Sequence, residues 1–410
     1  MAETPDWTYS VPRHAEAERI ITALCGGSPP ANACFAALDA HGWNALEAIA
    51  VRTRTANLLH RHIADNRLGV PALIGARLGD LYRRQSLYGL EQRLVLGRVA
   101  ELLDSRGIAN VALKGAALAF TVYPQPAMRP LRDIDVLVPS DRAAEAHYLL
   151  QQNGFSRAPW AKEYGTEFNH QLPELVSDRH NVTVEIHHRI YSRGWEGDAA
   201  ICAMLMETAQ SVTAGGKTCH LSAPLANLMH LTVHATLHNC FDNGPLTISD
   251  VHRLWHHPDL DRHLAVEMAD RLSLGRPLAL LLAIARTAGP LSLPPWLEAR
   301  IENAKAFVPT AMEAMFQIPA EVEQRALFRR LNIEQAGTGP LAAMAKMLQP
   351  DPQKLAEIAG SSSNDHRRWS AYPAWAWRRG RNYLAAAGNR DLRAAADRDA
   401  RMLAWLRKND

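Results

Sequence analysis

Two aspartates stand two residues apart in an apolar stretch in the first third of the chain. Asp133 and Asp135 belong to the run Asp-Ile-Asp-Val-Leu-Val, which has the apolar alternation of a buried β-strand. On such a strand both carboxylates point to one face, about 6.6 Å apart at the backbone, while Ile134 and Val136 point to the other. Two carboxylates so placed can bridge a pair of divalent cations about 4 Å apart. The chemistry that such a pair supports is in-line attack on a phosphorus atom.

A two-metal site of this kind needs a third carboxylate on a neighbouring strand, and Glu185 can supply it. Apolar and polar residues alternate from Val182 to His187, so this segment is predicted to be a strand with Glu185 on its polar face. Acidic side chains on one sheet face repel one another unless a cation lies between them. We therefore predict that Asp133, Asp135 and Glu185 ligate Mg²⁺ or Mn²⁺, hard cations that take oxygen ligands. The structural alternative is a chance pair of aspartates on a solvent-facing edge strand.

Lys114, Gly115, Arg129 and Arg132 precede the two aspartates in the chain. These four residues could bind phosphate. Lys114-Gly115 follows a short apolar run, at a point where a strand is expected to turn into a helix. Glycine lets backbone N–H groups approach an anion at a helix N-terminus, where the helix dipole also favours negative charge. Arg129 and Arg132 carry the planar fork that pairs with phosphate oxygens. The alternatives are a tight turn that merely needs glycine, and surface ion pairs for the arginines.

Three histidines recur every four residues in a later helical segment. His230, His234 and His238 share one helix face, but they are spread along about 12 Å of it and cannot all converge on one zinc ion. They therefore face either a cleft or the packed interior. Asp250, in the next helical segment, could orient one of the imidazoles.

A sheet is needed to bring the acids together, and the surrounding sequence predicts one. Strands are expected at Ile108 to Leu113, Ile134 to Val138, Phe168 to Val176 and Val182 to Ile190. Ser140-Asp141 can cap a helix that runs to Asn153 and that Gly154 would stop. Strands that alternate with helices over so short a span indicate a small α/β domain.

Helical patterns flank this domain on both sides. We expect a helical N-terminal region over residues 1–105, with a helix stop at Gly107, and the α/β core over 106–195. A helical region that closes a cleft follows over 196–300, with helices at Leu225 to His238 and from Thr247 to His256. Residues 301–410 complete a helical C-terminal region, in which Gly360 to Asn364 is interpreted as a flexible link.

The tail beyond this link has an unusual composition. From His366 to Tyr383 it interleaves arginines with Trp and Tyr side chains and contains no acid. Aromatic rings among cations can bind single-stranded nucleic acid or an anionic peptide. An amphipathic segment that docks on the main body is the favoured interpretation, because long basic side chains also cover apolar surface with their stems.

Composition limits the possible partners. A net charge of +3 over 410 residues gives no argument for nucleic acid or anionic lipid. Five scattered cysteines without a Cys-x-x-Cys pair favour reduced thiols in a cytoplasmic protein. The first thirteen residues lack the apolar run of a signal peptide, and the longest apolar stretch, Pro277 to Ala285, is too short to span a membrane. We therefore expect neither a membrane nor a nucleic acid as partner.

Taken in order, the motifs resemble those of a known family. Leu-Lys-Gly-Ala-Ala-Leu-Ala from Leu113, Tyr123-Pro124, Arg129, the Asp-Ile-Asp run, Asn-Gly-Phe155 and Val-Glu-Ile-His-His-Arg189 together resemble the uncharacterised bacterial nucleotidyltransferases of the polymerase-β superfamily. The resemblance runs from about Leu87 to Trp255 and implies an α/β (α+β) fold, a minimal nucleotidyltransferase sheet embedded between helical regions.

The resemblance also implies an activity. Asp133 and Asp135 would be the metal-binding pair, and Glu185 the third carboxylate, which also orients or deprotonates the acceptor hydroxyl. A nucleoside monophosphate would pass from a nucleoside triphosphate, with ATP expected, to a hydroxyl or phosphate of a small molecule, a peptide or a protein, and pyrophosphate would leave. The cleft wall would include His187, His234, His238 and Asp250.

Two departures from the family pattern keep other functions open. The superfamily usually has Gly-Ser or Gly-Gly before the first aspartate, whereas this chain has Gly115-Ala116 and then sixteen residues before Asp133. The missing hydroxyl removes one phosphate donor. One alternative is a glycosyltransferase that uses Asp-x-Asp to hold Mn²⁺ and a sugar nucleotide. Another is a non-catalytic nucleotide-binding or antitoxin-like protein that kept the fold.

Overall fold

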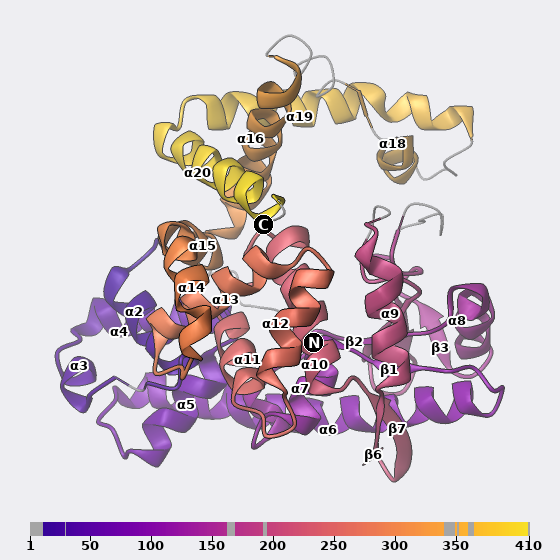
Figure 1. Cartoon of the computed structure of the whole chain (residues 1–410), viewed down its shortest axis with the longest axis horizontal. Helices are drawn as coiled ribbons and strands as arrows, with labels where there is room; N and C mark the ends of the chain where they lie inside the picture. The colour runs from indigo at the N-terminus through magenta and orange to yellow at the C-terminus, as the bar shows by residue number, and fades with distance from the viewer. Residues whose placement is uncertain are drawn as a thin grey trace.

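A seven-stranded mixed sheet lies among helices on one side of the molecule, at the right in Figure 1, in a computed structural model of the chain. The structure describes residues 11–28, 30–161, 169–191, 195–339, 349–350, 352–359 and 365–408. The predicted fold class, an α/β (α+β) sheet domain between helical regions, is confirmed.

Helices precede the sheet, as the sequence predicted for this part of the chain. They are α2 (Ala15–Cys25), α3 (Asn32–Ala36), α4 (Ala40–Arg52), α5 (Ala56–Asp65) and α6 (Ala72–Asp104). α6 is a helix of 33 residues that runs beneath the sheet (Figure 1), and its C-terminal half buries Val95, Leu96 and Val99 against the strands. Gly107 follows its end with a positive φ of 62°, a conformation that glycine adopts at no steric cost.

The strands of the sheet are short. They are β1 (Val111–Ala112), β2 (Asp133–Leu137), β3 (Phe155–Arg157), β4 (Leu175–Ser177), β5 (Thr183–His187), β6 (Gln210–Ala214) and β7 (Lys217–Leu221), in the spatial order β3-β4-β5-β2-β1-β7-β6. β2 and β5 are parallel neighbours at the middle of this order, and Asp135 lies directly opposite Glu185. Both strands that carry the acids therefore have a hydrogen-bonded neighbour on each side.

The two faces of β2 and β5 differ as the alternation predicted. Ile134, Val136, Val184 and Ile186 belong to a buried cluster that also contains apolar residues of α6 and of α8 (Ala143–Gln151). The acidic side chains alternate with them and so lie on the other face. The helix α7 (Lys114–Thr121) contacts β2, and its Ala116, Ala117 and Ala119 belong to the same buried cluster as Ile134 and Val136.

The strand predictions need four corrections. The first expected strand is only Val111–Ala112 long, and β3 was not predicted. Phe168, where the third strand was expected to begin, lies outside the described residues, and the strand found there is Leu175–Ser177. Residues 196–300, expected to form a helical region, also contain the hairpin β6–β7. Gly215 and Gly216 form its turn with φ of 58° and 76°, so a two-glycine hairpin signal was present in the sequence.

Helices make up most of the remaining described chain. They are α9 (Gly197–Glu207), α10 (Pro224–Thr232), α11 (Leu246–Trp255), α12 (Arg262–Arg271), α13 (Gly275–Ala288), α14 (Glu298–Ala304), α15 (Val308–Met315), α16 (Pro319–Thr338), α18 (Pro352–Ala359), α19 (Tyr372–Ala387) and α20 (Arg390–Leu406). α10 continues into one segment of π-helix, η3 (Val233–His238), which widens the turns that carry the histidines. The predicted helix Leu225 to His238 is thus present with a π-helical second half.

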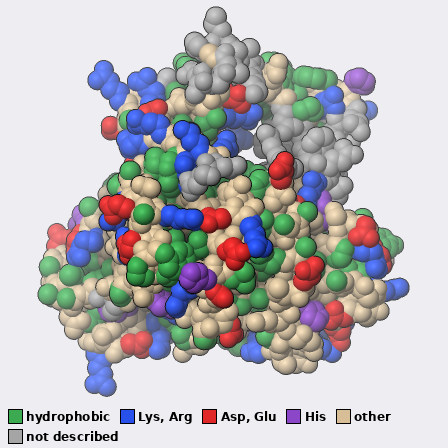
Figure 2. Space-filling view, viewed as in Figure 1, with side chains coloured by type: hydrophobic (Ala, Val, Ile, Leu, Met, Phe, Trp, Pro, Cys, Tyr) green, Lys and Arg blue, Asp and Glu red, His purple; other side chains and the backbone are tan. Residues whose placement is uncertain are grey.

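The helices α16, α18, α19 and α20 form a separate layer, which lies above the body of the molecule in Figure 1. A buried ion pair joins α16 to α20: the Arg325 guanidinium donates two hydrogen bonds of 2.7 Å to the Asp399 carboxylate. In the basic and aromatic tail Trp375 is buried, whereas Trp377 remains 75% exposed. Figure 2 shows several Lys and Arg side chains on this upper layer. The expected link Gly360 to Asn364 lies outside the described residues.

Of the helices in the described ranges, none combines the length and the apolar character that crossing a membrane requires.

Candidate active site

The acidic residues meet on one face of the sheet because their strands are parallel and in register. Asp135 pairs with Glu185 and Asp133 pairs with Thr183, so the three carboxylates project from two adjacent strands. Asp135 is buried, whereas Asp133 and Glu185 are partly exposed. Asp133 makes no hydrogen bond or ion pair with any residue that the structure describes. An acid held in such a place without a partner is typical of a cation site rather than of a structural ion pair.

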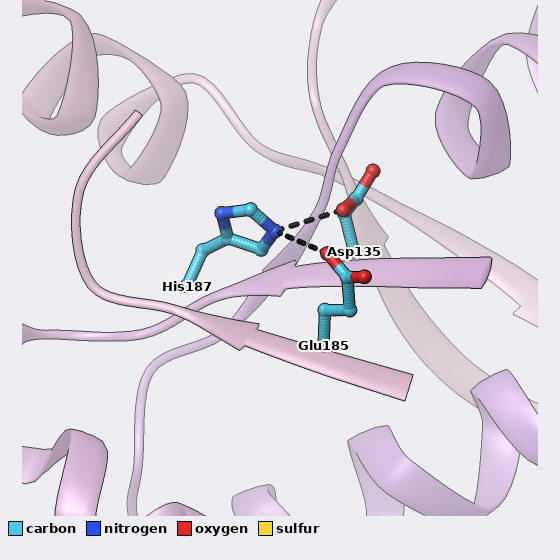
Figure 3. A group of neighbouring side chains, drawn as sticks. All are labelled: Asp135, Glu185 and His187. Atoms are coloured by element: carbon cyan, nitrogen blue, oxygen red, sulfur yellow. Dashed lines mark hydrogen bonds and ion pairs between the residues drawn. The ribbon is translucent and has the colours of Figure 1, made fainter. Parts of the chain in front are cut away.

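His187 lies two residues beyond Glu185 on the same strand face and contacts two of the acids. Its Nε2 is 2.8 Å from Asp135 Oδ1 and 3.3 Å from Glu185 Oε2 (Figure 3). The side chain is 1% exposed. His187 was predicted to be part of a cleft wall. It is instead buried, and its Nε2 contacts the carboxylates of both Asp135 and Glu185.

Lys114 approaches the acids from the first turn of α7. Its Nζ is 3.4 Å from Asp135 Oδ2, and the residue adopts a positive φ of 43° at the turn from β1 into the helix. Gly115 follows, and a Cβ atom there would lie 2.8 Å from Leu131 Cδ2. A side chain at this position would therefore require the Leu131 side chain to shift, so the space beside Gly115 is tight.

The neighbouring charges and burial shift the pKa values of Asp133 and Asp135 in opposite directions. Burial, helped by the neighbouring Asp135 and Glu185 carboxylates, raises the pKa of Asp133 to about 7. Burial alone would also raise the pKa of Asp135, but Lys114 and His187 outweigh it and hold this pKa well below its usual range. Without a cation, the site thus contains one firmly ionised carboxylate and one that readily takes up a proton.

A cleft of about 480 Å³ opens over these residues. Its polar wall contains cations, acids, imidazoles and amides: Arg54, Lys114, Arg129, Arg132, Asp133, Asp135, Glu185, Asp242, His170, His234, His238, Gln171, Asn239 and Asn243. The predicted acids, the predicted phosphate ligands and two of the predicted histidines therefore line one cavity. A second cavity, more open and larger at about 960 Å³, is lined by His252, His256 and His257 and does not include the acids.

Asp250 is not part of the cleft wall, contrary to expectation. It is 1% exposed and accepts hydrogen bonds of 2.8 Å from Arg129 Nε and Nη2, and one of 2.7 Å from the Tyr123 hydroxyl. It also does not orient a histidine. A buried carboxylate needs a cation and several donors, and Arg129 and Tyr123 provide them.

The Arg129 guanidinium is in turn engaged by Asp250, to which it donates two hydrogen bonds. Burial opposes its charge, but Asp250 raises the pKa of Arg129 above its usual range. Its third nitrogen, Nη1, donates to the Pro130 carbonyl. Arg129 borders the cleft, but three of its five N–H donors are engaged within the protein, so less of its fork is available to a phosphate than was predicted.

Among the arginines that line the cleft, Arg132 and Arg54 have N–H donors available for a ligand. Arg132 is exposed at the cleft and forms no ion pair with a residue in the described ranges, so the expected alternative of a salt bridge with Asp133 is wrong. Arg54 is partly buried, and its only described hydrogen bond goes to the Asn243 carbonyl at 3.2 Å. Burial, together with Arg132 and Arg129, lowers the pKa of Arg54 to about 9. Cations that repel one another at a cleft favour an anionic ligand.

Arg54 was missed by the sequence analysis, and so was His170. Arg54 follows α4 with a positive φ of 62° and reaches the cleft from a region with no phosphate-binding motif, so no local signal pointed to it. His170 belongs to a polar break, Asn-His-Gln, inside a segment that was expected to be a strand. That break was the available signal.

The histidines form a row of neighbouring rings that begins with His187, which contacts the acids. Ring centroids are 5.2 Å apart for His187 and His170, 5.0 Å for His170 and His238, and 5.6 Å for His238 and His234. Burial, with Lys114 next in effect, lowers the pKa of His238 to about 4 and that of His234 well below its usual range. Both imidazoles are therefore neutral near pH 7, and His230 lies behind them, fully buried.

The donor atoms fit a divalent cation. One ligand atom from each of Asp135, Glu185 and His187 lies within 4.8 Å of the others, and the Asp133 carboxyl adjoins this group on the same strand. Carboxylate oxygens suit Mg²⁺ and Mn²⁺, and an imidazole nitrogen is accepted by transition-metal ions. A cation here would offset the repulsion that raises the pKa of Asp133.

A mixed sheet that presents Asp-x-Asp and a third carboxylate on adjacent parallel strands, beside a cation-lined cleft, is typical of enzymes that transfer nucleotidyl groups with divalent metals. The sequence profile of a family described as "Uncharacterised nucleotidyltransferase" matches residues 39–289. The chain belongs to this nucleotidyltransferase family, as its motifs indicated. A search of curated proteins found no match to the chain.

Proposed function

We propose that the chain transfers a nucleoside monophosphate from a nucleoside triphosphate, with ATP the expected donor, to a hydroxyl or phosphate group of a small molecule, a peptide or a protein. The observation that carries this proposal is the placement of Asp135 opposite Glu185 on parallel strands, with Asp133 beside them at a cleft lined by cations. The cytoplasm, where nucleoside triphosphates are abundant, is the expected compartment.

The carboxylates would hold the metal and the cations would hold the triphosphate. Asp133, Asp135 and Glu185 are the proposed ligands of Mg²⁺ or Mn²⁺, which when bound would draw charge from the phosphate oxygens at the reacting phosphorus. Lys114, Arg132 and Arg54 are the proposed partners of the outer phosphates, with the N-terminus of α7 at Gly115 as a further donor. Arg129 is proposed to support this wall through Asp250 rather than to bind phosphate with its fork.

The bond changes follow from this placement. An acceptor oxygen attacks the α-phosphorus, and the bond from that phosphorus to the oxygen bridging to the β-phosphate breaks, so that pyrophosphate leaves. The acceptor proton passes to Glu185, which is partly exposed at the cleft and can reach an incoming hydroxyl. His234 and His238, neutral near pH 7, are proposed to line the pocket of the donor or the acceptor.

The family match and Glu185 together favour this reaction over the two alternatives. A glycosyltransferase that uses Asp-x-Asp would leave the pairing of Glu185 with Asp135 without a role. A non-catalytic relative would have no need to keep three carboxylates on one sheet face, where they repel one another.

The test is a pair of labelling reactions. The protein is incubated with Mg²⁺ or Mn²⁺, an extract of small molecules and proteins, and ATP labelled at either the α- or the γ-phosphate. Nucleotidyl transfer predicts a product that carries the α-label and lacks the γ-label, with pyrophosphate released in equal amount. A product that carries only the γ-label would contradict the proposal and indicate phosphoryl transfer.

A further inference from the structure

His187 stands at a point where two carboxylates converge on one nitrogen atom. Asp135 Oδ1 and Glu185 Oε2 lie 2.8 and 3.3 Å from His187 Nε2. A single N–H can point well at only one of them. The three side chains are 9%, 15% and 1% exposed, respectively, so solvent does little to separate the two negative charges. A cation at this point would satisfy both carboxylates at once.

The spacing of the three donor atoms suits a metal ion. Ligands at right angles around an ion, each about 2.1 Å from it, are about 3.0 Å apart. The two distances from His187 Nε2 lie on either side of that value. All three donors also lie within 4.8 Å of one another. The side chains could therefore bind one ion with only small rotations.

The other ring nitrogen of His187 is in a suitable position for this role. A histidine that binds metal through Nε2 carries its proton on Nδ1 and usually donates it to a second group. His187 Nδ1 is buried without a partner among the described residues, and so is Nδ1 of His170. The two rings are adjacent, with centroids 5.2 Å apart. A hydrogen bond between these nitrogens would satisfy both.

We propose that Asp135, Glu185 and His187 form an inner site for a divalent transition-metal ion such as Mn²⁺, separate from an outer, all-oxygen site at Asp133. Mg²⁺ prefers oxygen ligands, whereas an imidazole nitrogen favours transition-metal ions. Burial distinguishes the two sites, since His187 is fully enclosed and Asp133 is partly exposed at the cleft. The outer site rests on the proposed function, because the nucleoside triphosphate would bring its own Mg²⁺ there.

The test is spectroscopic and needs no turnover. Metal-stripped protein is loaded with one equivalent of Mn²⁺, and electron spin echo envelope modulation is recorded with and without a large molar excess of Mg²⁺. We expect modulation from one imidazole nitrogen that persists in the excess of Mg²⁺. Bound Mn²⁺ without nitrogen modulation, or Mn²⁺ that Mg²⁺ displaces completely, would overturn the proposal.

Two variants extend the test. His187→Gln should abolish the nitrogen modulation and weaken Mn²⁺ binding by about tenfold or more, the scale seen when metal-site residues are changed. The matched control is His188→Gln, because His188 is also buried but bonds to Ser140 Oγ at 3.0 Å instead of to the acids. Modulation that survives in His187→Gln would assign the nitrogen to another histidine and overturn the proposal.

The outcomes also separate this inference from the proposed function. Nucleotidyl transfer without nitrogen modulation would leave the function standing and remove the inner site. Nitrogen modulation without transfer of any labelled nucleotide would support the inner site and count against the function.

Discussion

Asp135 and Glu185 lie directly opposite each other on two parallel strands, although fifty positions separate them in the chain. This pairing makes the site, because it places a second carboxylate beside Asp135 on the same face of the sheet. Carboxylates so close together repel each other unless something positive lies between them. Lys114 and His187 supply part of that compensation in the structure, and a divalent cation would supply the rest.

Glu185 is expected to act mainly on the acceptor side. We predict that Glu185→Gln lowers the rate of nucleotidyl transfer by about a hundredfold or more, as the loss of a general base does. Binding of the nucleoside triphosphate, measured by calorimetry, should weaken much less, because Asp133, Asp135 and the cations remain. A variant that transfers at the parental rate would show that Glu185 is not the third catalytic carboxylate.

Arg54 is expected to bind the triphosphate. Arg54→Ala should raise the Kd of ATP by about thirtyfold, which corresponds to about 2 kcal/mol for a charge-assisted hydrogen bond, and should affect AMP much less. Arg67→Ala is the matched control, because Arg67 also follows a helix with a positive φ but is exposed and away from the cleft. Equal effects of the two substitutions on ATP binding would refute the assignment.

Asp133 should make the stability of the metal-free protein depend on pH. Burial and two neighbouring carboxylates raise its pKa to about 7, well above the value of about 4 expected in the unfolded chain. The folded state therefore holds a proton that the unfolded state releases, and stability is lost as pH rises from about 4 through about 7. In chelator, Asp133→Asn should have a higher Tm than the parent above pH 7 and the same Tm below pH 4.

Added metal should reduce this difference. A cation bound at Asp135 and Glu185 offsets the two charges that help to raise the pKa of Asp133, so in Mn²⁺ at pH 8 the Tm values of the parent and Asp133→Asn should lie closer together than in chelator. Thermal melts at both pH values, with and without Mn²⁺, check both statements. If the two proteins have the same Tm in chelator across the pH range, Asp133 has no raised pKa.

Asp250 is expected to be a structural residue that positions Arg129. Asp250→Asn should lower the free energy of unfolding by about 3 kcal/mol, because it leaves the buried Arg129 guanidinium without its counter-charge. Asp259→Asn, at an exposed position, serves as the control in the same denaturant titration. An Asp250→Asn protein as stable as the parent would contradict this role.

The sequence allowed the acids and their strands to be predicted because the signals are local. Apolar residues alternate with Asp133, Asp135 and Glu185 within two short segments, and the alternation alone assigns their faces. The fold class followed from the same segments and was confirmed. The hairpin at Gly215-Gly216 had an equally local signal but was overlooked.

Other parts of the site could not be predicted because they depend on contacts between distant segments. Arg54 reaches the cleft from 79 positions before Asp133, and Asp250 binds Arg129 across 121 positions. Neither contact produces a pattern of residue spacing that can be recognised in the sequence. The π-helix at Val233–His238 was also invisible, since its residues fit an ordinary helical pattern.

The most direct test of the central claim is the mutual dependence of metal and nucleotide binding at the carboxylates. Calorimetry would measure binding of an ATP analogue with a methylene bridge between the α- and β-phosphates, in Mg²⁺ or Mn²⁺ and in chelator. The parent and Asp135→Asn would be compared with Asp141→Asn, an exposed acid outside the cleft. We predict binding that needs the metal, is lost in Asp135→Asn and is unchanged in Asp141→Asn. Equal binding by all three proteins in chelator would contradict a metal-dependent nucleotidyltransferase site at these residues.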